Sequence, residues 1–187
     1  MAMNLIVGQS GGPTAVINSS LAGVYETAKN LGVNKVYGML YGIEGLLQEK
    51  MVDLDDMLGD IMSIELLKRT PSSYLGSCRC KLPTPEQDES VYDTLFRLFD
   101  KYEIGALLYI GGNDSMDTIA KLSAYGARIR SKVRFIGVPK TIDNDLMLTD
   151  HTPGYGSAAK YIATILKEVI ADASVYDIRS VTVAEIM

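Results

Sequence analysis

Short hydrophobic runs alternate along the chain with longer segments in which hydrophobic residues recur every three or four positions. The short runs predict strands at residues 4–8, 35–39, 106–110, 133–138 and 180–186. The longer segments predict helices at residues 15–31, 54–68, 85–102, 115–125 and 157–173. Apolar strands that alternate with helices are typical of a parallel sheet covered on both faces. We therefore expect an α/β fold: three α/β/α layers around a mostly parallel, Rossmann-like sheet.

Two boundary signals refine this pattern. Thr84, Pro85 and Glu86 predict a helix start, because proline suits the first turn and an acid stabilises the positive end of a helix. At the other end, the predicted strand 180–186 runs up to Met187 without a cap or a polar tail. Domains rarely end on a buried strand, so we interpret residues 1–187 as one truncated domain of a longer protein.

Composition and charge narrow the class of protein. A chain of 187 residues, 47% hydrophobic and 22% charged, is long enough for one core and typical of a soluble globular domain. The formal net charge is −5, and the basic residues are dispersed. Nucleic acids reward a clustered positive face, so we expect none as main partner. The N-terminus has no charged leader and no run that could span a bilayer, so we expect a cytoplasmic protein without a membrane partner.

The two cysteines, Cys78 and Cys80, are separated only by Arg79. Side chains two positions apart on an extended segment point to opposite faces, which disfavours a disulfide and favours a reducing compartment. A Cys-x-Cys pair is also a possible metal ligand. However, there is no second cysteine pair and His151 is the sole histidine, so we expect free thiols.

Candidate chemistry begins at residues 8–14, Gly-Gln-Ser-Gly-Gly-Pro-Thr, which follow the first predicted strand. Gly11 and Gly12 let the backbone approach a ligand closely, and the amides at the start of the next helix attract anions. The turn is neither a GxGxxG nor a Walker sequence. It is therefore either a phosphate-binding turn or a tight connection between strand and helix.

A second glycine turn follows the predicted strand 106–110. Gly111 and Gly112 precede Asn113, Asp114 and Ser115 at a predicted helix start. Asp or Ser at such a position commonly caps the helix. A carboxylate and an amide oxygen beside backbone N–H groups can also hold hydrated Mg²⁺ against phosphate oxygens, and the two roles can coexist.

The third turn, residues 137–145, reads Gly-Val-Pro-Lys-Thr-Ile-Asp-Asn-Asp. Lys140, Thr141, Asp143 and Asp145 leave the end of a predicted buried strand together. A solvated charged loop is the plain interpretation, but this set also supplies a base, a cation and a hydroxyl donor. Those groups are what phosphoryl transfer to a hydroxyl requires. All three turns lie at the carboxyl ends of predicted strands, where open α/β sheets bind ligands.

Several segments resemble the phosphofructokinase family in order and spacing: residues 10–12, 75–79, 111–115, 140–145, 149–158 and 183–187. The resemblance covers the whole chain, and its most specific part is Thr-Ile-Asp-Asn-Asp at residues 141–145. Family members build their site from two α/β domains. The resemblance implies that residues 1–187 form the first, which binds the phosphoryl donor, and that the sugar-binding second domain is absent. It also implies a homo-oligomer in the full-length protein.

The resemblance assigns roles residue by residue. Asp143 matches the base that takes the proton of the sugar 1-hydroxyl, with Lys140 beside it as a catalytic cation. Thr141, Asp145 and Met187 match positions that contact the sugar substrate or the transferring phosphoryl group. The implied contacts to the donor phosphates are Gly11, Gly12, Arg79, Gly112, Asp114, Ser115 and Lys140. The implied cofactor is Mg²⁺, held by Asn113 and Asp114. Here the chain departs from the family, which has an aspartate at position 113, and an amide oxygen is a weaker ligand for Mg²⁺.

Local residues discriminate between the family's two donors, pyrophosphate and ATP. ATP users usually have glycine at the positions of Asp114 and Lys140. A carboxylate at 114 would repel the α-phosphate of a nucleotide, and a lysine at 140 suits a small, highly charged donor. Bacterial ATP users hold adenine between aromatic residues at the positions of Leu40 and Cys80. Neither of these two residues is aromatic in this chain, although Tyr41 is adjacent to Leu40. We therefore expect pyrophosphate and fructose 6-phosphate as substrates.

Other functions fit the sequence less well. An ATP-dependent phosphofructokinase is the nearest alternative. A non-catalytic regulatory subunit would be favoured if the base were lost, but Asp143 is present. A lipid kinase would leave the lysine and the two aspartates of residues 140–145 unexplained. A dinucleotide dehydrogenase is excluded by the missing GxGxxG and ribose-binding acid.

Overall fold

Five strands form a single sheet in the computed structural model, which describes residues 3–186. The strands are β1 (Asn4–Gln9), β2 (Val36–Met39), β3 (Met51–Asp53), β4 (Ile104–Gly111) and β5 (Arg134–Pro139). Their order is β3-β2-β1-β4-β5, and only β3 pairs antiparallel to its neighbour. All six residues of β1 are buried, as expected for the central strand of a covered sheet. The mostly parallel sheet is confirmed.

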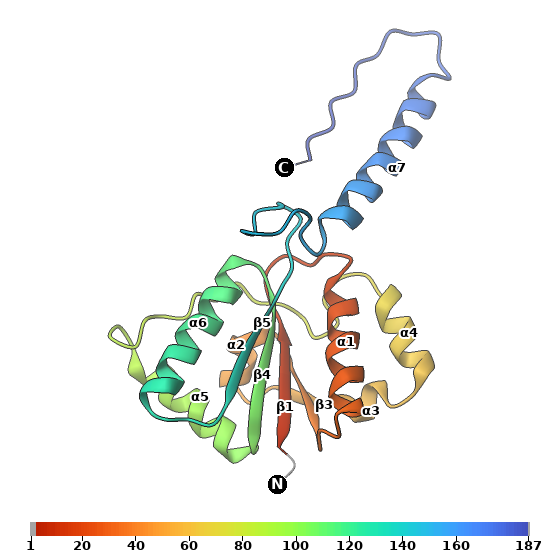
Figure 1. Cartoon of the computed structure of the whole chain (residues 1–187). Coiled ribbons are helices and arrows are strands. Elements are labelled where there is room, and N and C mark those ends of the chain that lie inside the picture. The colour runs from red at the N-terminus through yellow and green to blue at the C-terminus, as the bar shows by residue number, and fades with distance from the viewer. Residues whose placement is uncertain (1–2, 187) are drawn as a thin grey trace.

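Helices cover both faces of this sheet (Figure 1). One face packs against α1 (Ile17–Asn30), α3 (Leu54–Leu58) and α4 (Ile61–Arg69). The other packs against α2 (Gly42–Leu47), α5 (Glu89–Lys101) and α6 (Asn113–Arg128). Each face has its own hydrophobic cluster, one around Val7 and Leu21 and one around Leu107 and Phe99. These two clusters confirm the three-layer α/β/α architecture.

Two of the predicted helices differ most from the observed ones. The segment 54–68 forms two helices, because Asp60 accepts a hydrogen bond from the Ser63 amide (2.9 Å) and so starts α4. The helix expected at Pro85 begins instead at Glu89, where Asp88 accepts a bond from the Ser90 amide (3.1 Å). Pro85 lies in a separate turn that precedes this cap. In both cases an aspartate cap outweighs the apolar pattern.

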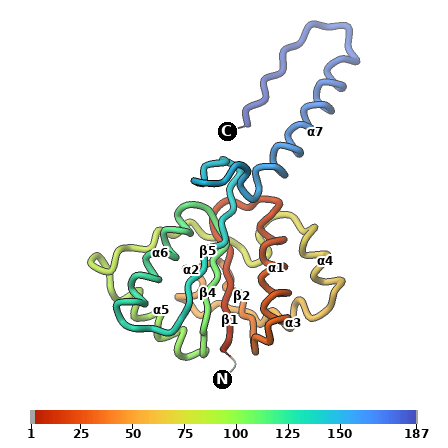
Figure 2. The backbone as a smooth tube through the Cα atoms, viewed as in Figure 1, coloured from red at the N-terminus to blue at the C-terminus, as the bar shows by residue number. Residues whose placement is uncertain are grey.

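The predicted strand 180–186 is wrong. These residues form neither strand nor helix, and Val181 and Val183 are 92% and 86% exposed. A strand needs a neighbour to pair its backbone groups, and none lies beside this segment within residues 3–186. In Figure 2, α7 (Tyr155–Ala173) extends away from the carboxyl edge of the sheet, and residues 174–186 turn back along it.

The short elements β3 and α2 are absent from the sequence-based prediction. β3 has three residues and α2 has six, two of them glycines, so neither leaves a clear hydrophobic period. Within residues 3–186, no helix combines the length and the apolar character that crossing a lipid bilayer requires.

Candidate active site

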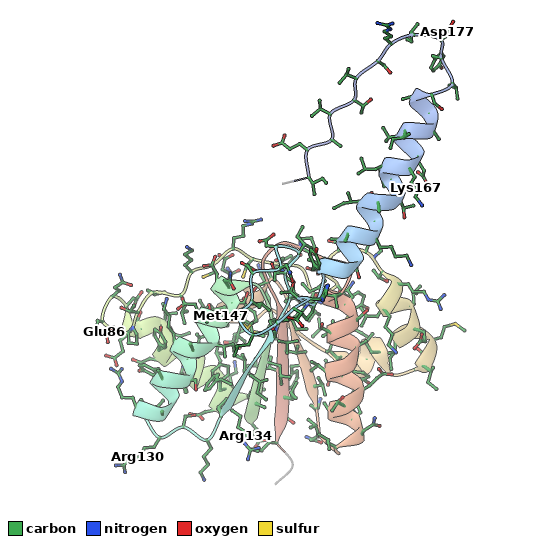
Figure 3. The ribbon with its side chains drawn as sticks, turned by 45° about the horizontal axis from the view of Figure 1, so that its top comes forward. Glu86, Arg130, Arg134, Met147, Lys167 and Asp177 are labelled. Atoms are coloured by element: carbon green, nitrogen blue, oxygen red, sulfur yellow. The ribbon has the colours of Figure 1, made fainter. Side chains whose placement is uncertain are left out.

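A cleft of about 690 Å³ opens at the carboxyl edge of the sheet. The turns after β1, β4 and β5 form its walls together with residues 78–81, because these three strands are parallel neighbours and end at the same edge. Every predicted site residue within residues 3–186 lines it: Gly11, Gly12, Arg79, Gly112, Asn113, Asp114, Ser115, Lys140, Thr141, Asp143 and Asp145. Met187 lies outside the described residues. In Figure 3, the labelled Met147 lies on the loop at this edge, whereas Arg130 and Arg134 lie at the opposite end of the sheet.

Gly11 has a left-handed backbone conformation (φ +75°), which favours glycine. A Cβ there would lie 3.2 Å from the Nζ of Lys140, so a side chain would crowd the cation. The Gly11 amide donates to the Cys78 carbonyl (3.1 Å), and the Ser77 hydroxyl donates to the Gly11 carbonyl (2.5 Å). These two bonds join the first glycine turn to the segment that carries Arg79.

Lys140 is buried under the cleft, with 4% of its surface exposed. Its amide donates to the Gly111 carbonyl (2.9 Å), and its ammonium group donates to the Gly12 carbonyl. Burial lowers the pKa of Lys140 below its ordinary value, and repulsion by Arg79 adds to this, while Asp143 acts in the opposite direction. A buried ammonium group near a guanidinium is stabilised by an anion between them. The cleft is therefore suited to bind a phosphate group.

The start of α6 forms the second side of this cleft. Gly112 is the N-cap residue and makes no side-chain cap bond, so the predicted capping role of Asp114 or Ser115 is wrong. The buried Ser115 hydroxyl instead hydrogen-bonds the Ser10 hydroxyl of the first turn. A Cβ on Gly111 would lie 2.0 Å from the Ser115 oxygen, so this contact requires glycine at 111. A helix N-terminus beside a buried cation favours negative charge. We call Gly11, Gly12, Ser115 and Lys140 the glycine–lysine cradle.

The third wall, residues 141–150, we call the aspartate loop. Asp143 and Asp145 are exposed on it. The Asp143 amide donates to the Thr141 hydroxyl (3.0 Å), and the Asn113 amide nitrogen donates to the Asp145 carboxylate (2.8 Å). Thus the loop presents two carboxylates to the cleft, and one of them is tied to the start of α6.

The oxygen donors of the cleft suit a hydrated magnesium ion. Within residues 3–186 no three His, Cys, Asp or Glu side chains are grouped to hold a metal ion. Mg²⁺ needs no such cage, because it binds one or two carboxylates together with water and phosphate oxygens. Asn113 uses its nitrogen for Asp145, which leaves its amide oxygen for another partner. Asp114 lies 3.5 Å from Lys81, and both side chains are exposed.

Two functional neighbours were missed in the sequence. Gln9 and Asn18 are buried and hydrogen-bonded to each other (2.9 Å). Gln9 accepts from the Leu75 amide (2.9 Å), and Asn18 accepts from the Tyr74 amide (3.0 Å). They therefore fix the backbone that leads to Arg79. One signal in the sequence could have identified Asn18. It is a polar residue on the apolar face of a predicted helix, the face that also carries Leu21, and such a residue needs a buried hydrogen-bond partner.

Both cysteines are free thiols, and Cys78 is buried. The Cys78 sulfur lies 3.4 Å from the Tyr109 hydroxyl. Burial raises the pKa of the Cys80 thiol and that of the Tyr109 hydroxyl, so both groups are neutral near pH 7. Cys80 and Tyr109 therefore contribute no charge to this part of the cleft. The charged side chains of the segment 78–81 are Arg79 and Lys81.

Comparisons with known proteins agree with this geometry. The family model described as phosphofructokinase matches residues 4–187. A Methylococcus capsulatus protein named pyrophosphate–fructose 6-phosphate 1-phosphotransferase is 41% identical over 173 residues, which cover 91% of this chain and 41% of that protein. A sulfofructose kinase of Alkalicoccus urumqiensis is 36% identical over 161 residues, covering 86% of this chain and 40% of that protein.

Among solved structures, a pyrophosphate-dependent phosphofructokinase from Nitrosospira multiformis superimposes with a TM-score of 0.83. It is 40% identical in sequence, and the match covers 92% of this chain and 42% of that one. The chain therefore spans about two-fifths of the length of the relatives that it matches.

Proposed function

Because this chain belongs to the phosphofructokinase family, we propose that it is the donor-binding half of an enzyme that phosphorylates fructose 6-phosphate with pyrophosphate. The observation that carries the proposal is the buried ammonium group of Lys140, which lies between two glycine turns and next to an exposed aspartate. The closely similar relatives named as pyrophosphate-dependent enzymes support the same donor.

The proposed reaction divides the cleft into donor and acceptor sides. Gly12, Lys140 and Arg79 hold the phosphates of pyrophosphate through a backbone amide and positive charge, and Gly11 lets the donor approach the turn because it has no side chain. Asp143 accepts the proton from the 1-hydroxyl of the sugar, whose oxygen forms the new bond to phosphorus. The bridging P–O bond of pyrophosphate breaks, and inorganic phosphate leaves. Thr141 and Asp145 hold the transferring group and the sugar.

Magnesium is the proposed cofactor, with Asn113 and Asp114 as its protein ligands. When bound, it would neutralise part of the charge on pyrophosphate. Phosphate oxygens and water would fill its remaining coordination positions. The Asn113–Asp145 hydrogen bond orients the amide so that its oxygen is free for the ion.

Several residues support pyrophosphate over ATP. Cys80 lines the cleft where an aromatic residue would be needed to hold adenine. Asp114 stands at the start of α6, where its carboxylate would repel the α-phosphate of a nucleotide, a group that pyrophosphate lacks. Lys140 supplies positive charge to the donor. For pyrophosphate, which carries no nucleoside, the carboxylate of Asp114 brings little penalty.

The test is an assay of the full-length protein with each donor. We expect turnover of fructose 6-phosphate with pyrophosphate and Mg²⁺, and kcat/KM for ATP at least tenfold lower. A preference for ATP would overturn the donor assignment. Sulfofructose should be tested as a second acceptor, because one relative is named a sulfofructose kinase. A strong preference for sulfofructose would keep the donor half of the proposal and replace its acceptor.

Residues 1–187 alone should show no phosphotransferase activity under the same conditions. Catalysis of this kind depends on positioning and on charge around the transferring group, and the relatives are more than twice as long as this chain. Equilibrium dialysis with pyrophosphate would check that the isolated chain still binds its donor. Turnover by the isolated chain comparable to that of the full-length protein would contradict its assignment as a donor-binding half.

A further inference from the structure

The aspartate loop raises a question of positioning. Asp143 is exposed, and the hydrogen bond that the structure gives it within residues 3–186 is the one from its amide to Thr141. No side chain among the described residues forms a hydrogen bond with its carboxylate, yet a general base must be held within hydrogen-bonding reach of the proton that it removes. The direction of Asp143 therefore depends on the backbone of the loop.

Asn144, which lies between the two aspartates, shapes that backbone. Its φ of +54° is in the left-handed region, which asparagine tolerates better than most residues. Its side-chain oxygen accepts a hydrogen bond from the Thr152 amide (3.0 Å), and its side-chain nitrogen donates to the Asp150 carbonyl (3.1 Å). The side chain of Asn144 thus joins the first part of the loop to residues 150 and 152, where the loop ends.

Thr152 connects this tie to the body of the protein. It is buried, with 3% of its surface exposed, and its hydroxyl donates to the Thr141 carbonyl (2.9 Å). The Thr141 amide in turn donates to the Pro153 carbonyl (2.9 Å). Both ends of the loop are therefore fixed to each other directly after β5, and Asn144 is the residue that transmits this anchoring to Asp143 and Asp145.

We propose that Asn144 is a positioning residue for phosphoryl transfer: through its left-handed backbone and its bonds to residues 150 and 152 it fixes the directions in which Asp143 and Asp145 project. This inference rests on the proposed function, because it takes Asp143 as the base. Asn144 itself contacts neither substrate. Its loss changes the placement of the carboxylates and leaves the glycine–lysine cradle intact.

Three substitutions separate the parts of this role. Asn144→Gly allows the left-handed backbone but removes both side-chain bonds. Asn144→Ala removes the bonds and disfavours the conformation as well. Asn144→Asp keeps the conformation and the acceptor for the Thr152 amide, loses the donor to Asp150, and adds a negative charge next to Asp143. Like charge raises the pKa of a neighbouring carboxyl, so this variant should also alter the pH profile.

The experiment measures kcat, KM for pyrophosphate and the pH dependence of kcat in the full-length protein and these variants. We expect kcat of Asn144→Ala to fall by about 10- to 100-fold, since a small misplacement of a reacting group is costly, while KM for pyrophosphate changes less than about threefold. Asn144→Gly should lie between Ala and wild type. Asn144→Asp should shift the acidic limb of the kcat profile to higher pH.

Asn34→Ala is the matched control. Asn34 also uses its side-chain nitrogen in a hydrogen bond, to Asn4 (3.1 Å), but it precedes β2 and lies at the other end of the sheet. This variant should keep wild-type kcat. An Asn144→Ala enzyme with kcat within twofold of wild type would overturn the inference, and so would a rise in KM at unchanged kcat.

A structural measurement separates this inference from the proposed function. Hydrogen exchange of the Thr152 amide should quicken in Asn144→Ala and Asn144→Gly but remain slow in Asn144→Asp, which keeps the acceptor. Equal exchange in all variants would overturn the positioning role, whatever the activity. If Asp143→Asn has no effect on kcat while the exchange pattern holds, the proposed function fails instead, and the base lies elsewhere.

Discussion

Lys140 and Asp143 are three positions apart, but one is buried and the other is exposed. The glycine–lysine cradle is built from packed groups: a buried ammonium, the backbone carbonyls of the glycine turn and the buried hydroxyl of Ser115. The aspartate loop carries exposed carboxylates on backbone that is tied by Asn144, Thr152 and Thr141. The Asp145 carboxylate also accepts a hydrogen bond from Asn113. A charge in the buried wall is strong because water is excluded, whereas a charge on the exposed loop is screened by water and salt.

This difference indicates a division of work. The cradle would bind a compact anion in one fixed place, and its contribution should depend on charge and packing. The loop would bring a base to an acceptor that arrives from outside, and its contribution should depend on geometry. Substitutions in the cradle, in the loop or near both test whether the two parts contribute independently to the reaction.

The largest effect is expected on the loop side. Asp143→Asn in the full-length protein should lower kcat by a factor on the order of 10²–10⁴, the range for a positioned acid–base group. KM for the sugar should change much less, because the amide keeps the size of the side chain. Steady-state kinetics with both substrates would measure this. Asp150→Asn, on the same loop, is the control and should retain activity; a fall of less than tenfold in Asp143→Asn would assign proton transfer to another group.

The cradle side should respond in binding of the donor. Lys140→Met removes the buried charge, and loss of a charge-assisted hydrogen bond is worth roughly 1.5–3 kcal/mol, or about 10- to 100-fold in kcat/KM for pyrophosphate. Lys132→Met, at the opposite end of the sheet, should leave this parameter unchanged. If Lys140→Met bound and used pyrophosphate as well as wild type does, the cradle would not be the donor site.

Asp114 tests whether donor choice is set by exclusion. Asp114→Gly should raise kcat/KM for ATP severalfold and weaken use of pyrophosphate, because it removes a repulsive charge and a proposed metal ligand. Lys81→Met is the informative control: it removes the partner of Asp114 but leaves the carboxylate, so ATP should not be admitted. ATP use that rises equally in both variants would mean that the ion pair, and not the charge of Asp114, excludes nucleotides.

The double variant Asp114→Gly with Lys140→Met sharpens this test. If both side chains act on one bound donor, their effects on kcat/KM for pyrophosphate should not add. Strict additivity would leave the donor class intact but would remove the claim of a common phosphate.

The smallest effect concerns stability. Burial lowers the pKa of Lys140 from its ordinary 10.5, so between the folded pKa and 10.5 the unfolded chain binds more protons than the folded chain. Stability therefore rises with pH across that window. Urea unfolding of wild type and Lys140→Met at several pH values up to 10.5 would isolate this term as their difference. A difference that fell with rising pH would contradict the lowered pKa.

The sequence predicted the cradle better than the framework around it. Gly11, Ser115 and Lys140 each follow a strand long enough to be identified from its apolar run, and parallel strands bring the segments after them to one edge. The strand predicted at 180–186 failed for a complementary reason. An apolar run shows that a segment can pair, but the existence of a neighbour is a property of the fold.

The supports of the cleft were also beyond the sequence pattern. Gln9 and Asn18 are buried amides whose partners are backbone groups more than fifty positions away, for example Asn18 with Ser72. Asn144 acts through a backbone angle and through residues 150 and 152. Periodicity reports which face of an element is buried, and it carries no information about such pairings.

The central place of β1 has a consequence for the order of folding. Leu5 pairs with Val36 of β2 on one side and with Ala106 of β4 on the other. Contacts between distant segments form slowly, because a long loop must close before they gain any energy. During synthesis from the N-terminus, β1, α1 and β2 can pack while β4 is still unmade. The Ser10–Ser115 contact joins these two halves of the chain. The cleft therefore forms only when β1 pairs with β4, the pairing between the strands most distant in sequence. Its formation can serve as a late marker of folding.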